Sequence, residues 1–535
     1  MNRIVTSSIA FLGLVVPAAA QRAPAGPPLY DNLGDLHYAV TAKPLAQKYF
    51  DQGLRLLYAF NHEEAARAFR EAERLDPHCA MCAWGEAYAL GPNINAPMDS
   101  ATGLRAQEAV RRAQKQAAGV TPRERDFIDA LARRYASPAT AERARLDTAY
   151  ARAMGAVAAR YPDDVEAQVL HAESLMDLSP WYYWNADGSP KADTEVILAR
   201  LEGVVAKQPN HPGACHFYIH AVEAKYPERA VPCAERLAAT MPGAGHLVHM
   251  PAHIYIRVGR WADAIEANQH AVHADHSLMD ANKLDRGGMY GQGYVPHNYH
   301  FLGFAATMAG QSRTAIEAAR GSAKAIAPQA AAAFPGIQWT LTAPYTTLVS
   351  FGRWDEILAE PLPDASLRYA TAMAYYARGV AFARKGRPVE ARAALDTVKA
   401  IEASVPEDDY RKALRIAALT LEGETALGAG NAVKAVTLFT RAVAIEDGLG
   451  YMEPPTWYYP VRHSLGRALL EAKRPTEAER AYREDLARFP DNGWSLTGLA
   501  LALDAQGKKA EAAATRKRLA ESWRNADVKV VASRY

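Results

Sequence analysis

Three groups of histidines stand at spacings that place their side chains on one face of a helix. A separation of three or four residues returns a side chain to the same face of an α-helix. In this 535-residue chain, the residues that share such spacings are His216, His220 and Glu223, then His246, His249 and His253, then His297 and His300. These eight residues are therefore the first candidates for chemistry.

Imidazoles gathered in this way are typical of a transition-metal site. Imidazole binds zinc, copper, nickel or iron, and the carboxylate of Glu223 is a further ligand that these ions accept. The sequence predicts a metal site formed by some subset of the eight residues, with zinc or copper as the ion. Two other interpretations stay open: the histidines could hydrogen-bond a ligand such as a peptide, or they could be satisfied core residues.

The histidine pattern does not match a known catalytic motif. The helical zinc-protease motif requires a glutamate directly after its first histidine, but Phe217 follows His216. No phosphate-binding glycine motif, nucleophile elbow or dinucleotide fingerprint occurs in a suitable context. Cys79-Ala-Met-Cys82 lacks the histidine that covalent haem attachment needs. We therefore expect no nucleotide or haem cofactor.

Helical repeats surround these histidines. One unit runs from Tyr49 to Pro77, with small residues where two helices would approach and large residues as knobs between them. The residues that define the spacing of this unit are Tyr49, Gly53, Leu56, Ala65, Phe69, Ala72 and Pro77. A similar spacing occurs again at Leu465, Gly466, Leu469, Ala478, Tyr482 and Pro490. A further copy contains Gly430, Ala435, Phe439 and Ala442.

This spacing resembles that of tetratricopeptide repeat (TPR) proteins, and the chain looks like an exported bacterial member. The resemblance covers residues 46–523 and implies an all-α, right-handed superhelical solenoid of antiparallel helix pairs. In such proteins the first helix of each pair lines a concave groove that binds ligands, commonly peptides. The repeat register would place the candidate histidines in that groove, with a one-residue slip for His216 and His220.

Aromatic residues at predicted groove positions are candidates for ligand binding. They are Trp84, Tyr88, Trp339 and Tyr376. Aromatic side chains could hold peptide side chains, although most such residues belong to the core of a repeat array. We expect the partner to be a polypeptide or a small molecule in the concave groove.

The ends of the chain and one insert complete the predicted organisation. Arg3, an apolar run over residues 9–16 and Ala18-Ala19-Ala20 indicate a signal peptide over 1–20, so a periplasmic or secreted protein is expected. A leader follows over 21–45, an N-terminal and central array over 46–275, a glycine-rich insert over 276–295, a C-terminal array over 296–523 and a tail over 524–535. The cysteines Cys79, Cys82, Cys215 and Cys233 could form sequence-local disulfides or stay buried thiols.

The charge pattern gives no reason to expect nucleic acid as a partner. The chain has 61 basic and 59 acidic residues, and the two signs are interleaved rather than gathered into a basic stripe. Nothing after the signal peptide reaches the roughly 20 apolar residues of a transmembrane helix. The pattern indicates no oligomeric state.

The leading interpretation is an exported TPR scaffold that binds a protein, peptide or other ligand and carries a histidine-rich metal site. The first alternative is a metal-dependent hydrolytic or redox enzyme, since a histidine site with an open position could activate water. In that case the glycine-rich segment 277–295 could act as a lid. The second alternative is a structural assembly adaptor in which the histidines are incidental.

Overall fold

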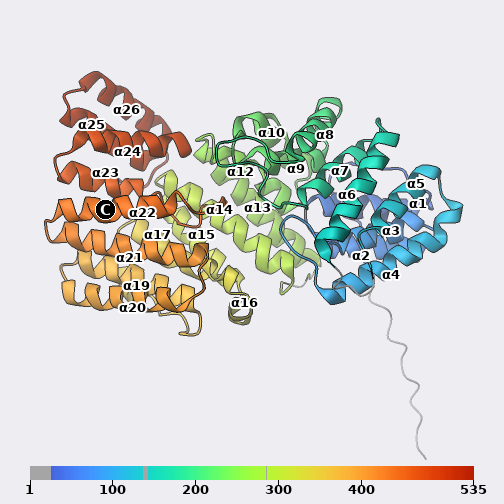
Figure 1. The fold of residues 1–535 in the computed structure, drawn as a ribbon, viewed down its shortest axis with the longest axis horizontal. Coiled ribbons are helices and arrows are strands. Elements are labelled where there is room, and N and C mark those ends of the chain that lie inside the picture. Colours follow the sequence, from blue (N-terminus) through green and yellow to red (C-terminus); the bar gives the residue numbers. More distant parts are fainter. Residues whose placement is uncertain (1–25, 137–141, 283, 285) are drawn as a thin grey trace, which may run out of the picture.

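The array is all-α, as predicted. A computed structural model describes residues 26–136, 142–282, 284 and 286–535, and helices succeed one another along these residues (Figure 1). The only extended pairing in the described part is two isolated bridges, Asn93 with Ala96 and Trp184 with Pro190. The predicted signal peptide over 1–20 lies outside the described residues. None of the described helices has the length and apolar character that crossing a bilayer requires.

The chain runs from its first helices at the right of Figure 1 to its last helices at the left. The first part comprises α1 (Pro44–Tyr58), α2 (His62–Leu75), α3 (Ala80–Ala89), α4 (Ser100–Gln116), α5 (Pro122–Ala132), α6 (Arg143–Arg160) and α7 (Val165–Met176). The central part comprises α8 (Thr194–Lys207), α9 (Pro212–Val222), α10 (Val231–Thr240), α11 (Gly245–His249), α12 (Pro251–Tyr255) and α13 (Trp261–Asn282). Short 3-10 segments η1 (Ala117–Gly119) and η2 (Pro227–Ala230) lie among them.

The last part begins after a π-helical turn, η3 (Tyr290–Tyr294). It comprises α14 (Val295–Met308), α15 (Ser312–Ala325), α16 (Pro328–Ala333), η4 (Pro335–Ile337), α17 (Trp339–Ser350), α18 (Trp354–Ala359), α19 (Arg368–Arg384) and α20 (Pro388–Ser404). It ends with α21 (Asp409–Gly428), α22 (Ala432–Glu446), α23 (Arg462–Glu471), α24 (Pro475–Arg488), α25 (Gly493–Ala505) and α26 (Lys509–Ser522).

Small residues let the two helices of a pair approach closely, as the repeat predicts. A Cβ atom on Gly53 of α1 would lie 2.7 Å from the Phe69 ring of α2. A Cβ atom on Gly423 of α21 would lie 2.7 Å from the Phe439 ring of α22. Because packed interiors leave no room for such an overlap, each glycine sets the helix spacing and the aromatic ring fills it.

The candidate histidines lie on the first helices of three consecutive pairs. These are α9, then α11 with α12, then α14, and the second helices α10 and α13 separate them in the chain. Pro251 has no amide proton to continue the α11 ladder, and α12 begins at this residue. A disulfide joins Cys215 of α9 to Cys233 of α10, and a second joins Cys79 to Cys82 at the start of α3.

Two segments of the C-terminal part return to earlier helices. The loop between α22 and α23 brings Glu453 to His253 of α12, at 3.1 Å between Oε2 and Nδ1. After α26, the Asp527 carboxylate accepts hydrogen bonds from the backbone amides of Ser312 (2.6 Å) and Arg313 (3.0 Å) at the start of α15. The C-terminal part is therefore tied to the central helices that carry the histidines.

Candidate metal centre

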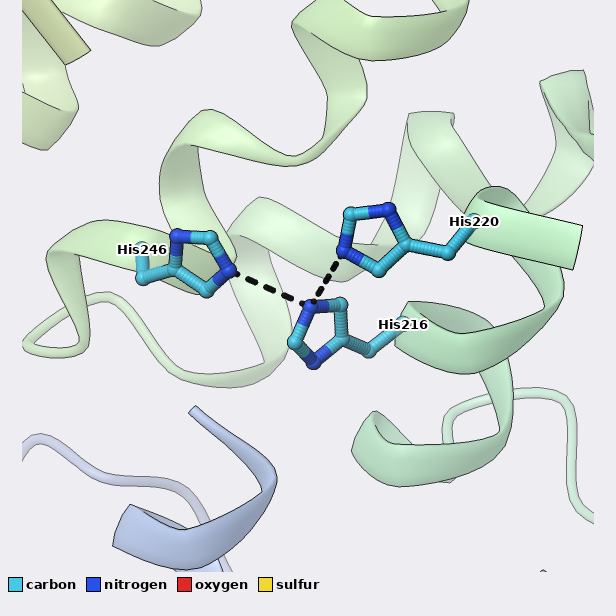
Figure 2. A group of neighbouring side chains, drawn as sticks. All are labelled: His216, His220 and His246. Atoms are coloured by element: carbon cyan, nitrogen blue, oxygen red, sulfur yellow. Dashed lines mark hydrogen bonds between the residues drawn. The ribbon is translucent and has the colours of Figure 1, made fainter. Parts of the chain in front are cut away.

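Three histidines converge on one point between α9 and α11. Figure 2 shows the side chains of His216 and His220 from α9 and His246 from α11 with their Nε2 atoms facing one another. The Nε2 atom of His216 lies 3.1 Å from that of His220 and 3.2 Å from that of His246. All three side chains are buried. These residues form the first triad.

The outer nitrogens of His216 and His220 fix which nitrogen of each ring carries the proton, whereas Nδ1 of His246 is buried without a hydrogen-bond partner among the described residues. Nδ1 of His216 lies 2.6 Å from the Tyr58 carbonyl oxygen, which can only accept, so this nitrogen donates. Nδ1 of His220 lies 3.2 Å from a Glu223 carboxylate oxygen and donates in the same way. The neutral forms of both rings then direct Nε2 lone pairs at each other. Such a pair repels unless a cation or a proton lies between them, and metal-bound histidines share this arrangement of outer partners.

A second triad lies beside the first and consists of His249 from α11, His253 from α12 and His297 from α14. The Nε2 atoms of His249 and His253 are 2.8 Å apart. The His297 ring centroid lies 4.9 Å from that of His249 and 5.6 Å from that of His253. One nitrogen from each residue lies within 4.8 Å of the others, so the three residues form a group that could hold one ion.

Asn268 of α13 orients His249 in the second triad. Its side-chain oxygen accepts a hydrogen bond from His249 Nδ1 at 2.7 Å, and its amide nitrogen donates to the Ala264 carbonyl at 2.7 Å. The second bond fixes the amide so that oxygen, not nitrogen, faces the histidine. His249 therefore presents an Nε2 lone pair to the triad.

Glu223 links the two triads. One carboxylate oxygen lies 3.2 Å from His220 Nδ1 and the other lies 2.7 Å from His253 Nδ1. Glu223, a predicted metal ligand, thus lies beside both sets of histidines. His220, Glu223 and His253 form a third group whose ligand atoms lie within 4.8 Å of one another. In the arrangement seen here the carboxylate holds the two rings through their outer nitrogens.

Most of these histidines are neutral, which is the form that binds metals. Burial lowers the pKa of His216, His246, His249 and His297 well below the ordinary value, and the neighbouring histidines lower it further. Neutral imidazoles with free lone pairs are therefore ready to accept an ion at neutral pH without losing protons.

His253 is the exception. Burial by itself would lower its pKa, but the negative charges of Glu223 and Glu453 outweigh burial and raise the pKa of His253 to about 9. Burial would raise the pKa of Glu223, but His253 and His220 lower it to about 2. Without an ion, a proton on His253 balances this carboxylate, and its Nε2–H faces the His249 lone pair.

Aromatic rings enclose both triads. Phe60 lies 4.4 Å from His216, Trp181 lies 4.8 Å from His220, and Phe301 lies 4.5 Å from His249, between ring centroids. The resemblance places the histidines in a groove, whereas His216, His220, His246, His249 and His253 are buried. The difference arises because Phe60 from the α1–α2 turn and Trp181 from the loop after α7 cover the first-helix face.

His297 and His300 border a cavity between α14, α17 and α19. Trp339, Thr346 and Glu453 are among its other lining residues. The His300 ring lies 4.3 Å from that of Trp339, and His300 belongs to neither triad. The predicted ligand-binding residue Trp339 thus lies on a cavity wall, next to a candidate histidine.

The other three predicted ligand-binding residues lie in the core. Trp84 and Tyr88 are buried and stack on each other with ring centroids 5.5 Å apart, and the Tyr88 hydroxyl donates to Glu173. Tyr376 is buried, with its hydroxyl 3.0 Å from that of Tyr458, which lines the cavity. Their role in ligand binding stays a prediction, and as placed here they support the walls of the array.

Sequence reasoning missed the groups that hold the histidines. Glu453 and the Tyr58 carbonyl come from segments far from the histidines in the chain, and Asn268 comes from the helix that follows α12. No periodicity links them to α9 or α12. The one available signal was the dense aromatic and proline segment over 451–460, which is unusual between two repeat helices.

The comparisons with known proteins reach only the architecture. No family model and no curated protein matches the chain. Among solved structures it is similar to the human IFIT1 dimer with m7Gppp-AAAA, at 13% identity over 93% of this chain and 92% of that chain, with a TM-score of 0.34. It is also similar to the human IFIT1 dimer with PPP-AAAA, at 13% identity over 91% and 92%, with a TM-score of 0.34. A likeness at this level carries no argument about function, and the succession of helix pairs by itself defines an all-α, TPR-like fold.

The expectation that this chain has no nucleic-acid partner is wrong. The IFIT1 structures contain RNA, capped or carrying a triphosphate, on proteins built from helices. The expected absence of a nucleic-acid partner therefore does not stand. The likeness does not assign RNA binding to this chain.

Proposed function

We propose that this chain is a TPR-like scaffold that binds transition-metal ions through its two histidine triads. The observation that carries the proposal is the meeting of the Nε2 atoms of His216, His220 and His246 at 3.1–3.2 Å, with the outer nitrogens of His216 and His220 held by acceptors. A core gains nothing from packing lone pairs together, whereas an ion at their centre satisfies all three.

Zinc or copper fits the donor set best. Three imidazoles leave one position of a tetrahedral ion open, and Zn–N distances of about 2.0–2.1 Å are within reach of small rotations of these side chains. Copper(II) binds nitrogen sites more tightly than zinc does, so availability and geometry decide between them. The two triads give a capacity of about two ions per chain.

We also propose that the protein acts outside the cytoplasm, in the periplasm or after secretion. The signal-like segment over residues 1–20 supports this, and so do the two disulfides, because disulfides persist mainly in oxidising compartments. Cleavage before Gln21 in the mature protein, read by N-terminal sequencing of the exported product, tests this part.

Metal analysis of untagged protein tests the proposal. Protein stripped with a chelator and reloaded with zinc or copper should retain about two ions after gel filtration, and His216→Ala should retain about one. The matched control is His273→Ala, an exposed histidine on α13 that should leave the metal content unchanged. Less than about a tenth of an equivalent in the unaltered protein would exclude the proposal.

A metal-dependent enzyme is the second candidate function. The observation that favours it is the position of His297, which belongs to the second triad and also lines the cavity. An ion held there could meet a substrate and polarise it or activate water. Hydrolytic or redox turnover that disappears in His297→Ala but persists in His273→Ala would establish this function; turnover unaffected by His297→Ala would exclude this site.

A further inference from the structure

The walls of the cavity beside the second triad have an unusual chemistry. Aromatic rings of Trp339, Phe304 and Tyr369 line it, and threonines and a serine of α17 form a polar stripe. Among its lining residues there is no lysine or arginine, and the only carboxylate is that of Glu453. A site for phosphate or carboxylate ligands would need a cation, so the wall composition disfavours anions.

Three hydroxyl groups of the polar stripe can only accept hydrogen bonds from a ligand. Thr342 donates to the Trp339 carbonyl at 2.7 Å, Thr346 donates to the Thr342 carbonyl at 3.2 Å, and Ser350 donates to the Thr346 carbonyl at 3.1 Å. Each hydroxyl has one proton, so these backbone bonds leave only lone pairs for the cavity.

Two further polar groups of the lining have the same character, whereas the neutral His300 ring also lines the cavity and carries one N–H donor. The Glu453 carboxylate is an acceptor, and the Tyr410 hydroxyl donates away from the cavity to the Gly336 carbonyl at 2.6 Å. Acceptors on one side and aromatic faces on the other are complementary to a molecule that has N–H donors and an aromatic or cationic body.

We propose that this cavity binds a small aromatic amine. The ring lies against Trp339 and the ammonium group donates to the acceptors of α17 and to Glu453. This inference goes beyond the metal proposal, because every group that it uses is present without an ion.

An isosteric ligand series tests the proposal. Tyramine, tyrosol and 4-hydroxyphenylacetate share one ring and differ at the end of the side chain as amine, alcohol and carboxylate. Binding to metal-free protein is measured by calorimetry and by tryptophan fluorescence. We expect tyramine to bind with a Kd below about 1 mM, and the carboxylate to bind at least about tenfold more weakly. Equal or tighter binding of the alcohol or the carboxylate would overturn the proposal, as would no tyramine binding.

Paired variants place the ligand in the cavity. Trp339→Leu and Thr346→Val should each weaken tyramine binding by about tenfold. Their controls are Trp354→Leu and Thr437→Val, which lie outside the cavity lining and change the same residue types. Binding that is equally weakened by the controls, or unaffected in both cavity variants, would show that tyramine sits elsewhere. A negative metal analysis leaves this test intact, because metal-free protein is used throughout.

Discussion

Glu453 contacts His253 at 3.1 Å although one residue lies in a loop of the C-terminal array and the other on a short helix of the central array. The carboxylate shares His253 Nδ1 with Glu223, which approaches to 2.7 Å. Two acidic groups thus converge on one ring of the second triad, while the first triad is held by Glu223 and a backbone carbonyl. The two triads should respond differently when these carboxylates are changed.

Glu453→Gln should weaken the second metal site alone. Loss of one carboxylate that holds a metal-ligating histidine typically reduces metal affinity by about 10- to 100-fold. Competitive titration with a chromophoric chelator should show that the affinity for one ion falls below that of the unaltered protein, and that the affinity for the other ion is unchanged. The control is Glu407→Gln, an exposed carboxylate paired with Arg415. Equal weakening of both ions would contradict this assignment.

Glu223→Gln should weaken both sites together. Its two oxygens contact His220 and His253, so the amide can accept from one ring and must turn its nitrogen toward the other. We expect the affinity of each ion to fall by about tenfold or more in the same titration. Selective loss of a single ion would mean that Glu223 serves only one triad.

The metal-free protein should lose stability in acid. Burial lowers the pKa of His62 and His171 to about 4, and it lowers the pKa of His216 and His246 well below the ordinary value of about 6.5. Below about pH 6.5 the unfolded chain takes up protons that the folded chain does not. The free energy of unfolding should therefore fall by up to about 1.4 kcal/mol per pH unit for each such histidine.

On the alkaline side, His253 should make the free energy of unfolding fall as the pH rises. Its pKa is raised to about 9, so its contribution is present below about pH 6.5 and is lost as the pH rises through 9. Urea unfolding of metal-free protein between about pH 4.5 and 9.5 should show a maximum near neutrality. A midpoint that stays constant down to about pH 5 would contradict the neutral, buried state of these histidines.

Opening the Cys215–Cys233 disulfide should destabilise the fold around α9, which carries two of the three histidines of the first triad. Cys215 directly precedes His216 on α9, and the bridge closes a loop with a sequence separation of 18. Loop-closure entropy gives a loss of about 3 kcal/mol for Cys233→Ser, measured by urea unfolding. Cys82→Ser breaks the bridge with a separation of 3 and should cost less. A larger loss in Cys82→Ser would show that loop closure is not the dominant effect.

The repeat pattern was sufficient to predict the helical architecture and the face that holds most of the site. Gly53 with Phe69, and the spacing of His246, His249 and His253, follow from helix periodicity, which is local. The partners of the histidines do not follow from helix periodicity, because these contacts depend on how distant segments pack. Phe60, Trp181 and Glu453 reach the triads from a turn and two loops, and no local rule determines where such segments end.

The same limit explains why three of the four predicted ligand-binding aromatic residues lie in the core. Trp84, Tyr88 and Tyr376 share helix positions with groove residues of resembling proteins, and the structure buries them against neighbouring helices and loops. Trp339 is the first residue of α17 and lines the cavity. Burial of this kind depends on the neighbours of each helix rather than on its own sequence.

The central claim is that metal ions occupy the two triads, and anomalous diffraction from crystals of zinc-loaded, untagged protein tests it most directly. Data on both sides of the zinc edge should show one peak equidistant from the Nε2 atoms of His216, His220 and His246, at about 2.0–2.1 Å from each. A second peak should lie among His249, His253 and His297. Zinc peaks confined to other parts of the chain, or no peak at either triad at full loading, would contradict the account.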